Sequence, residues 1–159
     1  MNGFRHRQPD VILVDVDSTL ADTRPRRLYC PTVDPAYTWT DYAMECADDQ
    51  PIAGTVRAVQ LFARAGFAIH LVTYRPYAAR VKTIDWLRRY DVPYHRLRMR
   101  TENDTGDSTS YKLGYLRAVC ELGFTPAQFI EDWPETAAAI EAAGVPVLCV
   151  NPRYTAPPV

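Results

Sequence analysis

The 159-residue sequence has few cysteines, no long apolar run near its start and almost no net charge. Its four cysteines form no Cys-x-x-Cys pair, and no histidine stands at the spacing of a metal ligand, which argues against a zinc module and a disulfide scaffold. We therefore expect small buried cysteines in a reducing compartment. They are Cys30, Cys46, Cys120 and Cys149.

The first apolar run, Val11–Val14, ends at Asp15 and is far too short for a signal peptide or a membrane span. We expect a cytoplasmic protein that makes no use of a membrane. The net charge of −1 argues against a binder held to nucleic acid by charge alone. Residues 75–100 nevertheless carry eight basic side chains against two acids, and we interpret them either as a solvated surface or as a rim that follows a nucleic-acid backbone.

Length and composition predict a single domain over residues 1–159, because 47% hydrophobic residues suffice for one core. No internal repeat or low-complexity tract is present. Residues 152–159 are rich in proline and are expected to form a loose tail.

Short, nearly continuous apolar runs alternate with segments of helical period. Such runs are typical of strands covered on both faces. The expected strands are 11–16, 67–72, 94–99, 127–130 and 145–150. Helical spacing marks 56–62 before Gly66, 81–87 behind Pro76, 113–120 before Gly123, and the alanine-rich stretch from Glu135 to Gly144. The alternation predicts an α/β fold in which helices cover both faces of a mainly parallel five-stranded sheet.

Chemically reactive side chains follow three of these strands. Parallel sheets bind ligands beyond the carboxyl ends of their strands, so we expect these side chains to converge. They are Asp15 and Asp17, then Thr73, Tyr74 and Arg75, then Glu131 and Asp132. A crevice with several carboxylates favours a hard divalent cation such as Mg²⁺, and a phosphate substrate would follow. Lys112 is one of two lysines in an arginine-rich chain, and a compact ammonium there suits phosphoryl oxygens.

These residues resemble the motifs of the haloacid dehalogenase-like (HAD) phosphohydrolases. The motifs are Asp15-Val16-Asp17-Ser18-Thr19, then Leu71-Val72-Thr73, then Lys112, then Phe129-Ile130-Glu131-Asp132. The resemblance covers residues 10 to 150 and implies a HAD-like Rossmannoid three-layer α/β/α sandwich. The stretch Met99–Lys112 is similar to the 3′-phosphatase domain of phage polynucleotide kinase-phosphatase, although Trp133 stands where those enzymes tend to carry arginine.

The resemblance also implies roles for the site residues. Asp15 would be the nucleophile and Asp17 the general acid and base. Mg²⁺ would be held by Asp15, by Asp17 through its backbone carbonyl, and by Asp132, with Glu131 beside them. Thr73 and Lys112 would hold the phosphoryl oxygens.

Further substrate contacts are expected from Arg75, Arg100 and Asp104. For several of these residues a structural role is the alternative. Asp132 could cap the helix that Pro134 opens, Arg75 could be a surface charge, and a lone threonine is often only a strand end.

Residues 21–52 form an insert that we interpret as a small cap or flap. Its apolar anchors are Trp39, Tyr42 and Met44, which could form its own small core or stack a nucleobase. The span from Thr73 to Lys112 has room for one helix and one strand, which leaves no large cap and predicts an open site.

These observations predict a Mg²⁺-dependent phosphomonoesterase that acts on a phosphorylated nucleic-acid end, as a polynucleotide 3′-phosphatase, with or without a separate kinase or ligase. The alternatives are a deoxyribonucleotidase for small nucleotides, a silent HAD-like scaffold and a phospho-accepting receiver domain. A receiver would take its phosphate on an acid after a middle strand, and none follows residues 67–72.

Overall fold

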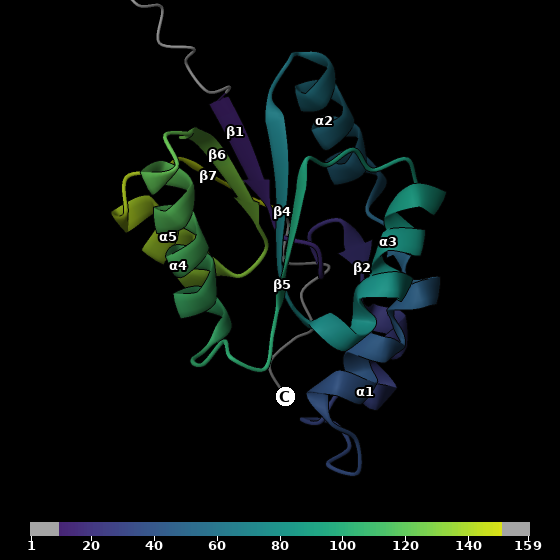
Figure 1. Cartoon of the computed structure of the whole chain (residues 1–159). Coiled ribbons are helices and arrows are strands. Elements are labelled where there is room, and N and C mark those ends of the chain that lie inside the picture. The colour runs from purple at the N-terminus through teal and green to yellow at the C-terminus, as the bar shows by residue number, and fades with distance from the viewer. Residues whose placement is uncertain (1–9, 151–159) are drawn as a thin grey trace, which may run out of the picture.

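The computed structural model describes residues 10–150, and it contains the parallel sheet that the sequence predicts (Figure 1). Its strands are β1 (Asp10–Val14), β4 (Ala68–Pro76), β5 (Arg96–Arg100), β6 (Thr125–Glu131) and β7 (Val147–Cys149). They lie in the order β5-β4-β1-β6-β7, and every neighbouring pair is parallel. The predicted α/β class with a five-stranded sheet is confirmed.

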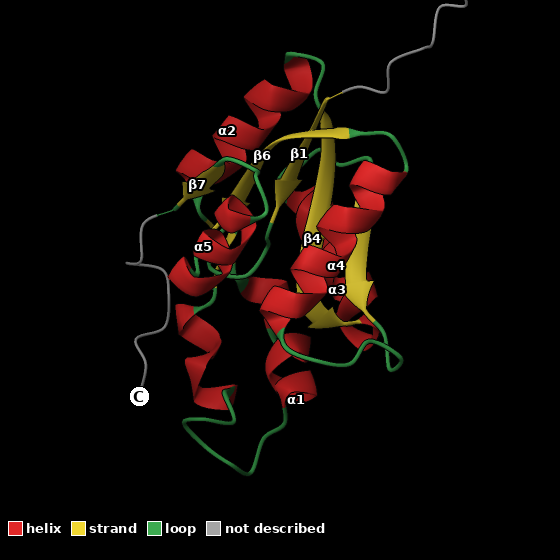
Figure 2. Ribbon diagram, turned by 90° about the vertical axis from the view of Figure 1, so that its left-hand side faces the viewer, coloured by secondary structure: helices red, strands yellow, loops and turns green. Residues whose placement is uncertain are grey.

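Helices cover both faces of this sheet, which gives the three layers visible in Figure 1. One layer contains α2 (Ala53–Arg64) and α3 (Arg80–Arg89), and the other contains α4 (Ser108–Glu121) and α5 (Pro134–Ala142). Figure 2 views the sheet from the side of α4 and α5. Helix α2 stops before Gly66, whose φ of +94° favours glycine, as the sequence predicts.

The central strand β1 supplies both halves of the core because its side chains alternate between the two faces. Ile12 and Val14 pack in the same buried cluster as Trp86 and Leu87 of α3. Val11 and Leu13 pack instead with α4 and α5. Each such side chain contributes about 1.5–3 kcal/mol to folding when fully buried. The two cores fix the sheet between the helical layers, and with it the carboxyl ends of the strands.

The strand ends differ from the predicted ones by one to four residues, and two of these differences affect residues of the site. Strand β1 ends at Val14 rather than at residue 16, because the chain turns there: the amides of Leu20 and Ala21 both donate to the carbonyl of Val16. Strand β4 continues to Pro76, so Thr73, Tyr74 and Arg75 lie within it. Pairing with β5 extends it, through a register shift before the pair Pro76 and Arg100.

The insert is joined to the sheet by a two-stranded antiparallel neck, β2 (Ala21–Asp22) and β3 (Gln50–Pro51). Between these strands lie the 3₁₀ helix η1 (Arg24–Tyr29), the helix α1 (Trp39–Met44) and the 3₁₀ helix η2 (Cys46–Asp48). Thr38 and Asp41 form a capping box that starts α1. Figure 2 places α1 at the end of the sheet to which the parallel strands run.

Basic side chains of α3 hold this insert in place. Lys82 Nζ donates to the carbonyl of Met44 at 2.6 Å, and Arg89 Nη1 donates to the carbonyl of Ala47 at 2.9 Å. Met44 also packs against a small buried cluster that includes Ala79, of the 3₁₀ helix η3 (Tyr77–Ala79), and Met99 of β5. Part of the basic segment 75–100 therefore has a structural role.

The expectation of buried cysteines is correct only for Cys46. Cys120 and Cys149 are exposed, and all four thiols are free. Their positions are set by the ends of helices and strands at the surface, which the spacing of cysteines does not reveal. No helix between residues 10 and 150 combines the length and apolarity needed to cross a bilayer. The predicted tail, 152–159, lies outside the described residues.

Candidate active site

The carboxyl ends of β1, β4 and β6 meet at a crevice of about 750 Å³. The chain adds β4 on one side of β1 and β6 on the other, so β1 lies where the strand order switches direction, the usual ligand position in such sheets. Asp15, Asp17, Lys112, Glu131 and Asp132 all line the crevice. The sequence therefore predicts correctly that these five side chains come together.

One group of crevice residues, the acid-rich cluster, consists of Asp15, Lys112, Glu131 and Asp132. Lys112 Nζ lies 2.9 Å from Asp15 Oδ1 and 2.8 Å from Glu131 Oε2. The three acids each place an oxygen within 4.8 Å of the others. Three carboxylates and one ammonium leave a formal charge of −2 in a site that is almost completely buried.

This surplus of negative charge perturbs the carboxyl groups. Burial, together with the neighbouring carboxylates, raises the pKa of Asp15 to about 7 despite the opposing effect of Lys112. Burial, followed by the charges of Asp15 and Glu131, raises the pKa of Asp132 to about 8. A divalent cation would relieve this repulsion, and oxygen ligands at this spacing fit Mg²⁺.

Glu131 is held more tightly than the other two acids. Its Oε1 accepts hydrogen bonds from the amides of Asp132 and Trp133, both at 3.1 Å, and its Oε2 accepts one from Lys112. The Thr19 hydroxyl lies 3.2 Å from an oxygen of Asp15 and 3.2 Å from an oxygen of Asp132. Protein donors thus fix the orientation of all three carboxylates.

A second group, the arginine cluster, consists of Asp17, Arg26, Asp49 and Arg75. Arg75 donates to Asp17 through Nε at 3.0 Å and Nη2 at 2.6 Å, and Arg26 Nη2 donates to the same Asp17 oxygen. Asp49 accepts from Arg26 at 3.1 Å and from Arg75 at 3.3 Å. Two carboxylates and two guanidinium groups balance, and both arginine side chains are buried.

The pKa values of this cluster reflect the pairing. Burial would raise the pKa of Asp17, but Arg26 and Arg75 outweigh it and hold the pKa well below its ordinary value. Burial raises the pKa of Asp49 to about 6, against the effect of Arg26. The resting site therefore keeps Asp17 ionised.

Arg26 and Asp49 were not expected in the site. Both come from the insert, on either side of α1, and the neck β2–β3 brings them back to the sheet. The sequence places Asp49 only among the acids of a flap, and Arg26 stands in an Arg-Pro-Arg-Arg run without helical period. Arg26 has one available signal, its position nine residues after Asp17 in the chain, whereas Asp49 stands 32 residues after Asp17 and has none.

Several expected substrate contacts lie elsewhere. Thr73 is fully buried, and its hydroxyl accepts a hydrogen bond from the amide of Arg75 at 3.2 Å; it does not line the crevice. Arg100 does line the crevice, but Asp104 lies outside it and pairs with Arg98 at 2.8 Å. The capping role considered for Asp132 is wrong, because Trp133 occupies the N-cap position of α5 and makes no side-chain cap.

Aromatic side chains form part of the crevice wall. Trp39 is 55% exposed and Trp133 is 41% exposed, and both line the crevice together with Tyr42 and Tyr74. Trp39 and Tyr42 meet edge to face with ring centres 5.8 Å apart. Met44 anchors the insert as expected, whereas Trp39 presents its ring to the crevice.

Solved structures share this fold at low sequence identity. One neighbour is a chain from the structure of the Pnkp1/Rnl/Hen1 RNA repair complex, with a TM-score of 0.76 and 19% sequence identity. The match covers 90% of the present protein and 42% of the neighbour's chain. CbbY from Rhodobacter sphaeroides, solved with phosphate, matches with a TM-score of 0.64 and 16% identity over 96% of this chain and 90% of its own.

The class C acid phosphatase from Bacillus anthracis, solved with tungstate, gives a TM-score of 0.61 and 15% identity, with 86% of this chain and 62% of that chain covered. A putative haloacid dehalogenase-like hydrolase from Bacteroides fragilis gives a TM-score of 0.65 and 18% identity, with 91% of this chain and 88% of that chain covered. These neighbours confirm the HAD-like fold inferred from the motifs. A search of curated protein sequences gives no match.

At the level of sequence, the family described as "PITM 1-3, LNS2 domain" matches residues 12–125. The match runs from β1 to the start of β6 and so includes the first aspartates, the insert and Lys112. The chain belongs to this LNS2-domain family and has the fold of the HAD-like hydrolases.

Proposed function

We propose that the protein is a Mg²⁺-dependent phosphomonoesterase that forms an aspartyl-phosphate on Asp15. The observation that carries this proposal is the acid-rich cluster, in which three buried carboxylates surround one ammonium at the ends of β1 and β6. Such a surplus of charge is costly to the fold and useful to a metal-assisted phosphoryl transfer.

Each residue of this cluster then has a chemical role. An Asp15 oxygen attacks phosphorus in line, and the bond to the leaving oxygen breaks. Lys112, positioned by Glu131, neutralises charge on the phosphoryl oxygens. Asp15, Asp132 and the carbonyl of Asp17 would hold Mg²⁺, which supplies further neutralisation of that charge. Thr73 would fix the backbone of β4 next to this site, because its hydroxyl accepts a hydrogen bond from the Arg75 amide.

Asp17 would transfer the protons of both steps. It protonates the leaving alkoxide, and in the second step it accepts a proton from the water that attacks phosphorus and breaks the bond to Asp15. Arg26 and Arg75 favour its ionised form, which suits the second step. The first step requires a proton on Asp17, so the anionic substrate would have to draw one of these guanidinium groups away.

We propose a phosphorylated nucleic-acid 3′-end as the substrate. Support comes from the crevice, beside which residues 10–150 place the small insert and no larger cap, and from Arg100, a cation on its rim. The likeness to a chain of an RNA repair complex agrees with this choice, and a kinase or ligase acting on the same end would be a separate protein.

A deoxyribonucleotidase for free nucleotides is the second candidate. The exposed rings of Trp39 and Trp133 at the crevice favour it, because both offer a face on which a single nucleobase can stack.

Phosphate release separates these functions. The substrates are a 3′-phosphorylated oligonucleotide, a 5′-phosphorylated one, and 3′- and 5′-deoxynucleoside monophosphates, each with Mg²⁺ and with EDTA. We expect Mg²⁺-dependent release, fastest from the 3′-phosphorylated oligonucleotide. Preference for free nucleotides would favour the second candidate, and no release from any substrate would leave a silent scaffold.

A further inference from the structure

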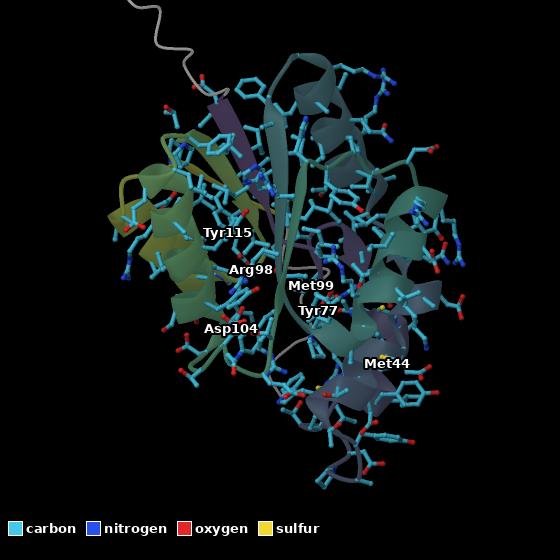
Figure 3. All side chains as sticks on the ribbon, in the orientation of Figure 1. Met44, Tyr77, Arg98, Met99, Asp104 and Tyr115 are labelled. Carbon is cyan, nitrogen blue, oxygen red and sulfur yellow. The ribbon has the colours of Figure 1, made fainter. Side chains whose placement is uncertain are left out.

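A second concave surface lies next to the crevice, between the edge strand β5 and helix α4. Within the part of the chain that the structure describes, strand β5 pairs with β4 and leaves its other edge open. Leu97 and Met99 of β5 pack toward α2, α3 and the insert. The alternation of a strand sends Arg96, Arg98 and Arg100 to the opposite face. Figure 3 shows Arg98 on the side of α4 and Met99 on the other side.

The space between this arginine face and α4 is a groove of about 600 Å³, which we call the α4–β5 groove. Arg98 lines it from β5, and Tyr111, Gly114 and Tyr115 line it from α4. Asp104, at its lower end in Figure 3, accepts hydrogen bonds from Arg98 and from the amide and hydroxyl of Thr101. Asp104 thereby holds the Arg98 guanidinium over the groove.

Gly114 gives the helical wall of the groove a position without a side chain. Glycine in the middle of a helix is unfavourable compared with alanine. A Cβ on Gly114 would meet no atom within 4 Å, so no contact inside the described chain requires glycine there. The missing side chain leaves the groove wider at its helical wall. This is what a site for a bulky planar ligand requires.

Arginines and tyrosines alternate from the groove to the crevice. The Arg98 guanidinium lies 5.5 Å from the ring centre of Tyr111, and the Arg100 guanidinium lies 4.8 Å from that of Tyr74. Arg100 and Tyr74 line the crevice, and the Tyr74 ring meets the ring of Tyr111, which lines the groove, with ring centres 5.6 Å apart, so the two concave surfaces are neighbours. Cations interleaved with aromatic rings are the pattern by which proteins hold single-stranded nucleic acid.

We propose that the α4–β5 groove binds the single-stranded nucleic-acid segment adjoining the phosphorylated end. A base would stack in the groove against the partly exposed ring of Tyr115, and backbone phosphates would meet Arg98 and Arg100. The inference rests on the proposed function and specifies it, since a free nucleotide fills the crevice alone. It also narrows the expected basic rim, residues 75–100, to the arginines of β5, because Lys82 and Arg89 of α3 hold the insert.

Binding of a fluorescent ten-nucleotide 3′-phosphorylated DNA, measured by anisotropy in EDTA so that no turnover occurs, tests the groove. We expect Gly114→Leu to fill it and weaken binding about tenfold, the loss of one stacked base. Arg98→Gln should weaken binding about fivefold and lower its salt dependence. Arg88→Gln is the matched control, because Arg88 is exposed on α3 and lies 3.7 Å from Asp85 alone.

Thermal melting checks that the variants fold, and Gly114→Leu should melt no lower than the parent because leucine favours helix. Where phosphate is released, the ratio of kcat/KM for the oligonucleotide to that for the mononucleotide should fall about tenfold in Gly114→Leu. Two results would contradict binding of nucleic acid in the groove. One is unchanged oligonucleotide binding in both groove variants, and the other is oligonucleotide binding no tighter than that of the mononucleotide. Absence of phosphate release would overturn the proposed function alone, because the binding assay needs no catalysis.

Discussion

Asp15 and Asp17 are two residues apart, yet they belong to clusters with different formal charges, −2 for the first and zero for the second. Asp17 joins the arginine cluster, where two acids meet two arginines and the formal charge is zero. Asp15 joins the acid-rich cluster, where three acids share one lysine. The arginine cluster balances its own charges and holds Asp17, the proposed proton donor and acceptor, whereas the acid-rich cluster has a surplus of negative charge that a cation would offset.

The position of each cluster agrees with this division. The arginine cluster ties the insert to β4, because Arg26 and Asp49 come from the insert and Arg75 from the strand. The acid-rich cluster draws only on β1, α4, β6 and the residues beside them, which are fixed by the two cores. Loss of Arg26 or Asp49 should therefore affect stability, whereas loss of a charge in the acid-rich cluster should affect the reaction or metal binding.

The largest expected effect is on catalysis. Asp15→Asn removes the nucleophile at constant volume, and kcat should fall by at least about 10³-fold. The same change relieves repulsion among the acids, so the melting temperature in EDTA should stay constant or rise. Phosphate release and thermal melting measure the two effects. Activity near that of the parent would end the assignment of Asp15.

The next effect is on stability. Asp49→Asn leaves buried Arg26 and Arg75 short of one carboxylate, and the free energy of unfolding should fall by about 3 kcal/mol. Asp48→Asn is the control, since the neighbouring Asp48 side chain is 99% exposed and lies 3.8 Å from Arg89; it should cost less than about 0.5 kcal/mol. Urea denaturation in EDTA measures both. Equal values for the two variants would contradict a supporting role for the arginine cluster.

Metal binding should distinguish the clusters in turn. A cation that binds only the folded protein stabilises it by about 2.7 kcal/mol at a concentration of 100 Kd. We expect Mg²⁺ to raise the melting temperature of the parent and of Asp49→Asn, and to lose this effect in Asp132→Asn. Retention of the Mg²⁺ effect in Asp132→Asn would place the metal elsewhere.

The smallest effect is on the pH dependence of stability. The folded protein raises the pKa of Asp15 to about 7 and of Asp132 to about 8, so it binds protons that the unfolded chain has lost. Stability in EDTA should therefore fall as pH rises through 7 and 8. The fall should be shallower in Asp15→Asn and should disappear in Mg²⁺. Melting curves between pH 6.5 and 9, with and without Mg²⁺, provide the comparison, and parallel curves would contradict it.

The sheet and its acids were predictable because local patterns determine them. Apolar runs locate β1, β4 and β6, and the rule that parallel strands carry ligands at their carboxyl ends brings Asp15, Lys112 and Asp132 together. Local patterns do not determine the order of the strands in the sheet, but right-handed crossovers restrict that order to a few arrangements.

The arginine cluster and the groove were not predictable in this way. Arg26 reaches Asp17 only because the neck closes the insert, and short 3₁₀ and α segments leave little periodic signal. The sequence alone suggests that Arg75 is a free cation. Its guanidinium is fully buried, however, and a buried charge is stable only when carboxylates such as Asp17 and Asp49 pair with it. The sequence also cannot separate the arginines of β5 from the basic residues of α3, which hold the insert.

The central claim is that the acid-rich cluster carries the chemistry through Asp15. Its most direct test is to mix the protein with Mg²⁺ and an oligonucleotide bearing a ³²P-labelled 3′-phosphate, quench with acid within one turnover, and map the labelled peptide. We expect acid-stable, hydroxylamine-labile label on Asp15 and none in Asp15→Asn. Label on another residue, or phosphate release with no labelled protein at any quench time, would contradict it.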